Sequence, residues 1–354
     1  MPTRPPPHHD SDWEGVRLHV VTGKGGTGKT TVAGALALAL ATDGRRTLLC
    51  EVEGRQGLAQ VFDVAPLPYE ERRIAVAPGG GEVVALPVEP KAALLEYLDL
   101  FYHLGRAGKM LEKMGAIDFA TTVAPGLRDV LLTGKVYEAV RRREAGGPVY
   151  DAVVLDAPPT GRITRFLNVN EEVVGLAKVG PIRNQANSIM TVLRSPQTTV
   201  HLVTVLEEMP VQETQDAVAE LREVGLPVGG IVVNMVRDPI LPARALTAAV
   251  RDKLDRDEVL AGLEVAGLGR AGGRGGGPGA TGRASEAASR IGILADGLLL
   301  EAAQHGERVA LESLQRKELA ELGRPTYELP AMPGGIDPGA LYELAERLID
   351  QGMA

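Results

Sequence analysis

A glycine-rich octapeptide near the amino end constrains the fold of this chain of 354 residues more than any other feature. It fits the pattern G-x-x-x-x-G-K-[ST], and it lies between a β-branched run, 16–22, and an Ala/Leu-rich run, 30–41, that is typical of a helix. Glycines let the backbone wrap around a phosphate, and the start of the helix adds the positive end of its dipole. The alternative is a Gly-rich turn that binds nothing. The candidate phosphate-binding residues are Gly23, Lys24, Gly25, Gly26, Thr27, Gly28, Lys29, Thr30 and Thr31.

Short apolar runs, separated by helical pattern, follow along the rest of the chain. Alternation of this kind is typical of a mostly parallel β-sheet flanked by helices. Together with the phosphate-binding loop it predicts an α/β fold of the P-loop NTPase class. The expected strands cover residues 16–22, 47–52, 83–88, 149–156, 200–206, 229–234 and 326–329.

The predicted organisation is a flexible tail, 1–15, followed by a single P-loop domain, 16–354. Residues 90–145 carry Leu and Met at helical spacings without a strand signal, which indicates a helical insertion. Residues 267–283 are nearly all Gly, Arg, Ala and Pro, and such a segment buries too little apolar surface to offset its ordering entropy. We therefore expect a mobile loop there. Helical pattern returns over 284–322 and 338–351.

Composition excludes several classes of protein. Hydrophobic residues make up 44% of the chain and charged residues 24%, which is typical of a folded globular protein and excludes fibrous and wholly disordered chains. The net charge of −8 opposes broad electrostatic binding to nucleic acid or to an anionic membrane. The longest strongly apolar run, 33–41, is too short for a membrane helix, no signal peptide is recognisable, and the single Cys50 forms no internal disulfide. The expected location is cytoplasmic.

Two lysines of the octapeptide are notable because arginine is the usual cation of this chain. Nine of the 38 basic residues are lysine, yet Lys24 and Lys29 both fall within eight positions. A compact ammonium suits a crowded phosphate site better than a planar guanidinium does. Both lysines are therefore candidate catalytic residues, and Lys29 has the position of the P-loop lysine that reaches the terminal phosphates.

The lysine directly after the first glycine makes GKGGTGKT resemble the deviant Walker A loop of the nitrogenase iron protein, of cell-division and partition ATPases, and of the arsenite-pump and tail-anchored-protein-targeting ATPases. Residues 156–167 resemble the D-T-A-P-T-G-H-T-x-R-x-L switch of the last of these families, with Arg162 in place of its histidine. The sequence looks most like the actinobacterial anion-transporting-ATPase-like paralogues. This resemblance implies a nucleotide-sandwich dimer, in which Lys24 reaches the partner's nucleotide, formed either by two copies or with a paralogue.

Acidic residues at two expected strand ends are candidates for binding a metal and for placing water. Asp156 ends an apolar strand like a Walker B aspartate, and together with the hydroxyl of Thr30 it would bind Mg²⁺. By the resemblance, Glu53 aligns with the family's Asp that orients the attacking water, which makes it a candidate catalytic and metal-binding residue. The residues after it, 54–57, replace the family's Pro-Ala-His-Asn. The alternative is an acidic turn that is simply solvated.

Three further residues are candidates for binding the nucleotide base. Asn234 ends the expected strand 229–234 and occupies the family's adenine-reading position, although Asn also commonly caps strands. Pro330 and Met332 lie in a segment that resembles the family's late loop lining the base. Pro159, in the switch segment, completes the set of candidate nucleotide-binding residues.

Missing ligands argue against two properties of the resembling family. One cysteine cannot build a three-thiolate arsenite site, and no Cys-x-x-Cys pair is present to hold zinc. The six histidines have no ligand spacing, so no metal other than Mg²⁺ is expected. The apolar residues of 90–145 are compatible with a groove for a hydrophobic protein client or with ordinary core. In the same region Arg128 replaces an Asp of the family's P-G-I-D-E turn.

The sequence thus predicts a Mg²⁺-dependent ATP hydrolase, a nucleotide-switched dimer that handles a protein or membrane-associated cargo rather than arsenite. The alternative is a slow or inactive nucleotide-binding regulatory subunit that acts in a complex with a paralogous ATPase. A DNA- or membrane-positioning ATPase is disfavoured, because the last helix, 338–351, is amphipathic but acidic. We expect no nucleic-acid partner and no stable membrane insertion.

Overall fold

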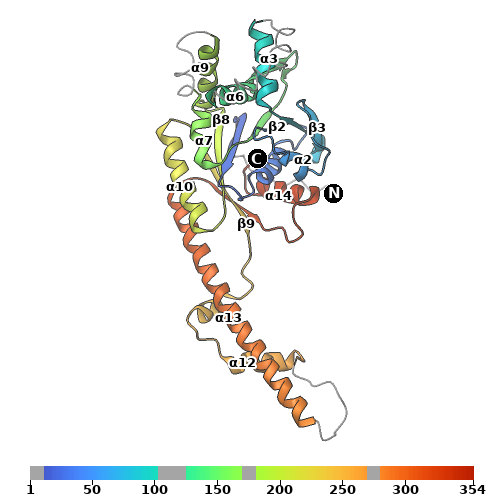
Figure 1. Cartoon of the computed structure of the whole chain (residues 1–354), viewed down its shortest axis with the longest axis vertical. Coiled ribbons are helices and arrows are strands. Elements are labelled where there is room, and N and C mark those ends of the chain that lie inside the picture. The colour runs from blue at the N-terminus through green and yellow to red at the C-terminus, as the bar shows by residue number, and fades with distance from the viewer. Residues whose placement is uncertain (1–11, 103–124, 170–180, 269–279) are drawn as a thin grey trace, which may run out of the picture. The chain divides into compact units, whose positions relative to one another are not determined.

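The computed structural model describes residues 12–102, 125–169, 181–268 and 280–354 (Figure 1). The chain divides into two compact units: unit 1 comprises residues 1–236 and 318–354, and unit 2 comprises residues 237–317. The single-domain organisation expected above stays a prediction. The helices of unit 1 are α1 (Lys29–Leu40), α2 (Gly57–Val61), α3 (Pro90–Tyr102), α6 (Pro125–Arg141), α7 (Thr160–Leu167), α9 (Pro181–Leu193), α10 (Glu208–Glu223) and α14 (Pro338–Asp350).

Eight strands form the sheet of unit 1, in the order β10-β9-β8-β1-β7-β2-β4-β3. Every neighbouring pair is parallel except β3 and β4, which run antiparallel, so β10 and β3 are the two edges. This arrangement confirms the predicted mostly parallel α/β fold. The strands are β1 (Leu18–Gly23), β2 (Arg46–Glu51), β3 (Arg72–Val76), β4 (Glu82–Pro87), β7 (Ala152–Asp156), β8 (Thr198–Thr204), β9 (Val228–Val236) and β10 (Thr326–Pro330), with a separate two-residue pair, β5 (Arg143–Glu144) and β6 (Gly147–Pro148).

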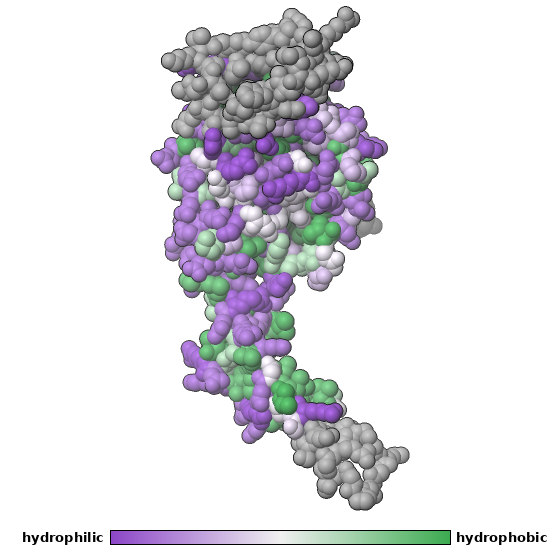
Figure 2. Space-filling model, viewed as in Figure 1, coloured by the Kyte–Doolittle hydropathy of each residue, from purple (hydrophilic) through white to green (hydrophobic). Residues whose placement is uncertain are grey.

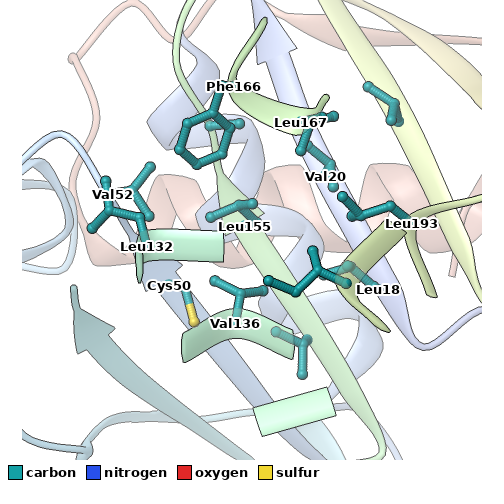
Figure 3. Packing of buried hydrophobic residues seen from close by; sticks show 14 of the residues in the cluster. Leu18, Val20, Cys50, Val52, Leu132, Val136, Leu155, Phe166, Leu167 and Leu193 are labelled. Carbon is teal, nitrogen blue, oxygen red and sulfur yellow. The ribbon is translucent and has the colours of Figure 1, made fainter. Parts of the chain in front are cut away.

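Apolar residues cover both faces of this sheet, which explains why its strands are continuous hydrophobic runs rather than alternating ones. On one face the strands pack against α1, α2 and α14, and on the other against α6, α7, α9 and α10 (Figure 1). The second face is shown in Figure 3, where strand residues Leu18, Val20 and Leu155 share a cluster with Val136 of α6, Phe166 of α7 and Leu193 of α9. The central strand β1 is buried along its whole length, and it delivers the glycine-rich loop to one end of the sheet.

Two segments differ from expectation, and a third lies partly outside the described residues. The sequence predicted no strand at β3, because this antiparallel edge strand carries the exposed Arg72 and Arg73 and lacks an apolar run. Helix α13 (Ala280–Glu321) begins inside the segment 267–283 that was expected to be a loop, and residues 269–279 lie outside the described part. Within the expected insertion, α3 and α6 are described, whereas 103–124 lie outside the described residues.

The end of the expected flexible tail is anchored on unit 1. Residues 12–15 form turns, and the indole N–H of Trp13 donates a hydrogen bond of 3.0 Å to the hydroxyl of Tyr327 on β10. That hydroxyl donates in turn to the carboxylate of Asp12 at 2.6 Å. Trp13 also packs edge-on against the ring of His201, with 5.0 Å between ring centroids. Residues 1–11 lie outside the described part of the chain.

Two buried histidines on neighbouring strands lie behind Trp13. Nδ1 of His19 on β1 lies 3.1 Å from Nε2 of His201 on β8, and Nδ1 of His201 accepts a hydrogen bond from the backbone N–H of Gly230. Burial lowers the pKa of His19 to about 4 and that of His201 well below its usual value, and the positive charge of Arg324 nearby also lowers the pKa of His201. Both imidazoles are therefore neutral in the folded protein at physiological pH.

We expect the free energy of unfolding to fall as the pH drops below about 6.5. The folded-state pKa of His19 is lower than that of an unfolded histidine, so between these two pKa values the unfolded chain binds a proton at this residue and the folded chain does not. The free energy of unfolding therefore decreases further as the pH falls to about 4. At pH 5 this one group costs about 2 kcal/mol. Denaturant unfolding at pH 7.5 and at pH 5 measures the loss, and His19→Gln should reduce it. An unchanged pH dependence in that variant would contradict the prediction.

Unit 2 contains α11 (Ala243–Val250), α12 (Arg256–Val265) and most of α13. Its small core joins Leu263 of α12 to Ile291 and Ala295 of α13, and an ion pair of 2.6 Å between Arg256 and Asp296 links the same two helices. Figure 2 shows apolar side chains among polar ones on the surface of this unit, and α13 exposes Ile293, Leu294, Leu298, Leu300, Leu311 and Leu314.

Candidate active site

The glycine-rich loop joins the end of β1 to the start of α1, as the sequence predicted. At Gly23, a Cβ atom would lie 2.1 Å from the backbone oxygen of Val203 on β8, so only glycine permits this approach of the two strands. Gly28, directly before α1, has the left-handed backbone conformation (φ 84°), and a Cβ there would lie 2.3 Å from Nδ2 of Asn234. Two of the pattern's glycines thus have a steric reason in this structure.

Hydrogen bonds hold the loop in a compact turn. The hydroxyl of Thr27 donates to the backbone oxygen of Lys24 at 2.9 Å, and Nδ2 of the buried Asn234 donates to the backbone oxygen of Thr27 at 2.9 Å. Asn234 therefore supports the loop from the end of β9. Its predicted contact with an adenine base stays a prediction.

A hydroxyl and a carboxylate meet at the end of the loop. The side chain of Thr30 donates a hydrogen bond of 2.7 Å to Oδ2 of Asp156, which ends β7 and is 7% exposed. Burial raises the pKa of Asp156 to about 7, although the hydrogen bond from Thr30 and the positive charge of Lys29 both favour its ionised form. The negative charges of Glu51 and Glu53 act in the opposite direction. A cation bound here would offset the desolvation of the carboxylate.

Oxygen atoms of this kind are suited to Mg²⁺, which prefers hydroxyl, carboxylate and phosphate ligands. Within the ranges that the structure describes, no three His, Cys, Asp or Glu side chains gather into a metal site. Thr30 and Asp156 alone would leave most of an octahedral shell to water and to phosphate oxygens, which is the usual arrangement for Mg²⁺ at phosphate sites. The residues present therefore fit this cation.

Two glutamates at the carboxyl end of β2 have different surroundings. Glu51 is buried and lies in register with Asp156, and its carboxylate accepts hydrogen bonds from the backbone N–H groups of Arg55, Gly57 and Leu58 at 3.2, 2.9 and 3.4 Å. It thereby fixes the turn that follows β2. The sequence analysis did not identify Glu51 as a candidate site residue. Its position at the carboxyl end of a buried strand could have indicated it, because ligands of parallel sheets bind at that end.

Glu53, the residue chosen from the sequence, points to a different neighbour. Its Oε1 lies 3.9 Å from a guanidinium nitrogen of Arg162 on α7, and its side chain is 21% exposed. The structure thus brings Glu53 next to α7 rather than into hydrogen-bond contact with Thr30. Its catalytic and metal-binding roles stay predictions.

Lys24 is held by a partner that the sequence did not indicate. Its Nζ lies 2.7 Å from Oε1 of Glu213 on α10, and Oε2 of the same carboxylate accepts a hydrogen bond of 3.1 Å from Thr160, the first residue of α7. The hydrogen bond from Lys24 lowers the pKa of Glu213. One carboxylate therefore joins the glycine-rich loop to the start of α7.

The other candidates lie along the same end of the sheet. Pro159 directly precedes α7, and Thr31 is in the first turn of α1. Pro330 ends β10 in register with Val236 of β9, close in sequence to Asn234, and Met332 is partly buried against the core. The positions of these residues are compatible with a base site, whose occupant is untested.

No helix in the described ranges is both long and apolar enough to cross a membrane.

The comparisons with known proteins show the family of this chain. Residues 16–195 match the anion-transporting ATPase family. The chain is 50% identical over 340 residues to the ATPase BagA of Mycobacterium tuberculosis, which covers 96% of this chain and 94% of the relative. It is 28% identical over 251 residues to ATPase GET3 of Kluyveromyces lactis, a match that covers 61% of this chain and 71% of the relative. It is also 26% identical over 268 residues to a protein of Chlorobaculum tepidum provisionally assigned as an arsenical pump-driving ATPase, a match that covers 63% of this chain and 62% of the relative.

Proposed function

This chain belongs to the anion-transporting ATPase family and is an ATPase, and on that basis we propose that it hydrolyses ATP with Mg²⁺ as a nucleotide-switched dimer. The contact between Thr30 and Asp156, at the end of a glycine-rich loop and beside Lys29, carries this proposal. The hydroxyl of Thr30, the carboxylate of Asp156 and the ammonium of Lys29 at one end of the sheet support the proposal, because phosphoryl transfer needs groups that hold a metal ion and the phosphates.

The chain's own residues would share the work as follows. Backbone N–H groups of the loop and the ammonium of Lys29 bind and orient the terminal phosphates. Thr30 and Asp156 would hold Mg²⁺, which when bound neutralises charge on the phosphate oxygens. Glu53 would orient the attacking water once it is free of Arg162. Glu53 lies on the turn that Glu51 holds through hydrogen bonds, so the conformation of that turn determines where the carboxylate of Glu53 can be placed.

The ion pair between Lys24 and Glu213 bears on the proposed dimer. In this structure the ammonium of Lys24 contacts Glu213 of its own chain at 2.7 Å rather than a second subunit. Dimer closure would therefore exchange this contact for one across the interface. Because Glu213 also accepts a hydrogen bond from Thr160, the exchange would alter this contact at the start of α7.

Native mass spectrometry of the full chain with Mg-ATP, alongside phosphate release, tests the dimer. Wild type should double its mass with Mg-ATP and hydrolyse ATP. Lys24→Ala should stay monomeric and lose at least about tenfold in rate, because it removes a charge that acts on the transition state. The matched control is Lys253→Ala, which removes an exposed lysine of unit 2 and should behave as wild type. A Lys24→Ala protein that still dimerises and hydrolyses normally would refute the proposal.

We propose that the cargo is a hydrophobic protein segment rather than arsenite. Arsenite binding needs several thiolates, whereas Cys50 is the single cysteine of the chain and is completely buried. Burial raises the pKa of its thiol to about 12, so the group stays protonated at physiological pH. A buried, protonated thiol is a poor metalloid ligand.

A second candidate function is a slow regulatory subunit that supports a paralogous ATPase. The proximity of Glu53 to Arg162 favours it, because a glutamate attracted to a guanidinium is less available to orient water. The same phosphate-release assay separates the two candidates. Activity of the chain alone supports the self-sufficient enzyme, whereas activity that appears only after mixing with its paralogue supports the regulatory subunit.

A further inference from the structure

A pocket of about 220 Å³ lies between the turn after β2 and helices α6 and α7 of unit 1. Three segments that are distant in the sequence build its wall: the turn after β2, the first turn of α7 and the first turns of α6. The lining residues include none from the loop 23–31, so the pocket is separate from the phosphate-binding loop. Its volume equals that of about seven water molecules, which is the size of a small molecule rather than of a nucleotide.

Charged side chains dominate this wall. Arg55, Arg128 and Arg162 supply three positive charges, while Glu53 and Asp129 supply two negative ones, so the lining has a net charge of +1 although the whole chain carries −8. Nε of Arg128 is buried, and among the residues that the structure describes it has no hydrogen-bond partner. Because that nitrogen is closed off from solvent, it is the outer guanidinium nitrogens of Arg128 that can donate to a ligand in the pocket.

The three arginines come from segments that lie far apart in the sequence: Arg55 from the turn after β2, Arg128 from α6 and Arg162 from α7. The fold brings their side chains to the wall of one pocket.

The geometry points to a binding site for a small dianion, either a phosphate or a dicarboxylate. Guanidinium groups present paired N–H donors that match the two oxygens of a carboxylate or phosphate. An anion between Arg128 and Arg162 competes with Glu53 for Arg162, whose present contact is 3.9 Å long and exposed. The site stands independently of the proposed function. One consequence does rest on the proposed function. An anion that binds Arg162 releases Glu53 from its contact with that guanidinium, and this raises the rate of ATP hydrolysis.

Isothermal titration of the full chain tests the site, with Mg-ADP present to fill the phosphate-binding loop and with constant ionic strength. Malonate and inorganic phosphate are the two probes, titrated separately. Wild type should bind one equivalent of at least one probe. Arg128→Gln should weaken this binding about tenfold or more, and Arg128→Lys, which keeps the charge but loses the planar fork, should weaken it less. The matched control Arg194→Gln, on an exposed arginine after α9, should leave the affinity unchanged.

The two probes distinguish the sources of the anion. Binding of malonate supports a carboxylate ligand, and binding of phosphate alone supports phosphate, the product of hydrolysis, as the ligand. No saturable binding, or equal affinity in wild type and Arg128→Gln, overturns the site. If Arg128→Gln does not fold, as judged by circular dichroism, the anion affinities of Arg128→Lys and Arg55→Gln are compared with that of wild type instead. Malonate binding in a chain whose phosphate release does not depend on Lys29 would leave the site standing while the proposed function fails.

Discussion

Replacing Lys29 by alanine should reduce ATP hydrolysis by about 10³-fold or more. The Lys29 ammonium lies at the first residue of α1, close enough to Asp156 to affect the pKa of that carboxyl group. A positive charge at this point stabilises the charge that develops on the transferring phosphoryl group, and no other residue of the loop replaces it in the same position. Phosphate release at saturating Mg-ATP measures the effect.

The control for Lys29→Ala is again Lys253→Ala, which makes the same chemical change far from the loop in sequence. Thermal unfolding without nucleotide should give similar midpoints for Lys29→Ala and wild type, because the Lys29 side chain is only partly buried. A Lys29→Ala protein that is folded and retains more than about a tenth of the rate would contradict the assignment of this loop as the catalytic phosphate site.

Replacing Gly23 by alanine should destabilise unit 1 by about 3 kcal/mol or more. A Cβ at Gly23 would lie 2.1 Å from the backbone oxygen of Val203, and backbone atoms of two paired central strands cannot move apart without breaking the ladder between β1 and β8. Denaturant unfolding without nucleotide measures the loss. The strain falls on the strand that delivers the loop, so nucleotide binding should fail as well.

Gly25 provides a matched control within the same loop. A Cβ at Gly25 would meet no atom within 4 Å, and its backbone does not have the left-handed conformation that disfavours alanine. Gly25→Ala should therefore leave the free energy of unfolding unchanged or raise it by up to about 1 kcal/mol, because alanine reduces the entropy of the unfolded chain. Equal destabilisation by both substitutions would show that the close approach at Gly23 is not the cause.

Much of the sheet could be predicted because its central strands are buried on both faces. Such strands are continuous apolar runs, as at β1, β7 and β9, and they differ clearly from helical pattern. The edge strand β3 lacked this signal, since two of the five residues in RRIAV are charged and none is fully buried. The early start of α13 was missed because glycine and arginine composition, rather than periodicity, dominated the prediction for 267–283.

The candidate site was predictable where a local pattern specifies it and not where tertiary contacts do. The loop, Thr30 and Asp156 follow from short motifs whose strand and helix context the structure bears out. The contact between Lys24 and Glu213 joins the glycine-rich loop to α10, and no spacing pattern in the sequence predicts it. The pairing of His19 with His201 was equally hidden, because each residue alone reads as one position of an apolar strand.

The two edges of the sheet restrict how copies of this chain can associate. Arg72 and Arg73 are exposed on β3, whose register with β4 shifts before Ala75. On β10, the side-chain amide of Gln351 accepts from the backbone N–H of Glu328 and donates to its backbone oxygen, so it occupies both groups that an added strand would use. Charged residues, irregular register and covered backbone groups all oppose continuation of a ladder by a second chain. In the proposed dimer, subunits would therefore recognise one another through side chains and loops, where a bound nucleotide can alter the fit, rather than through a shared sheet.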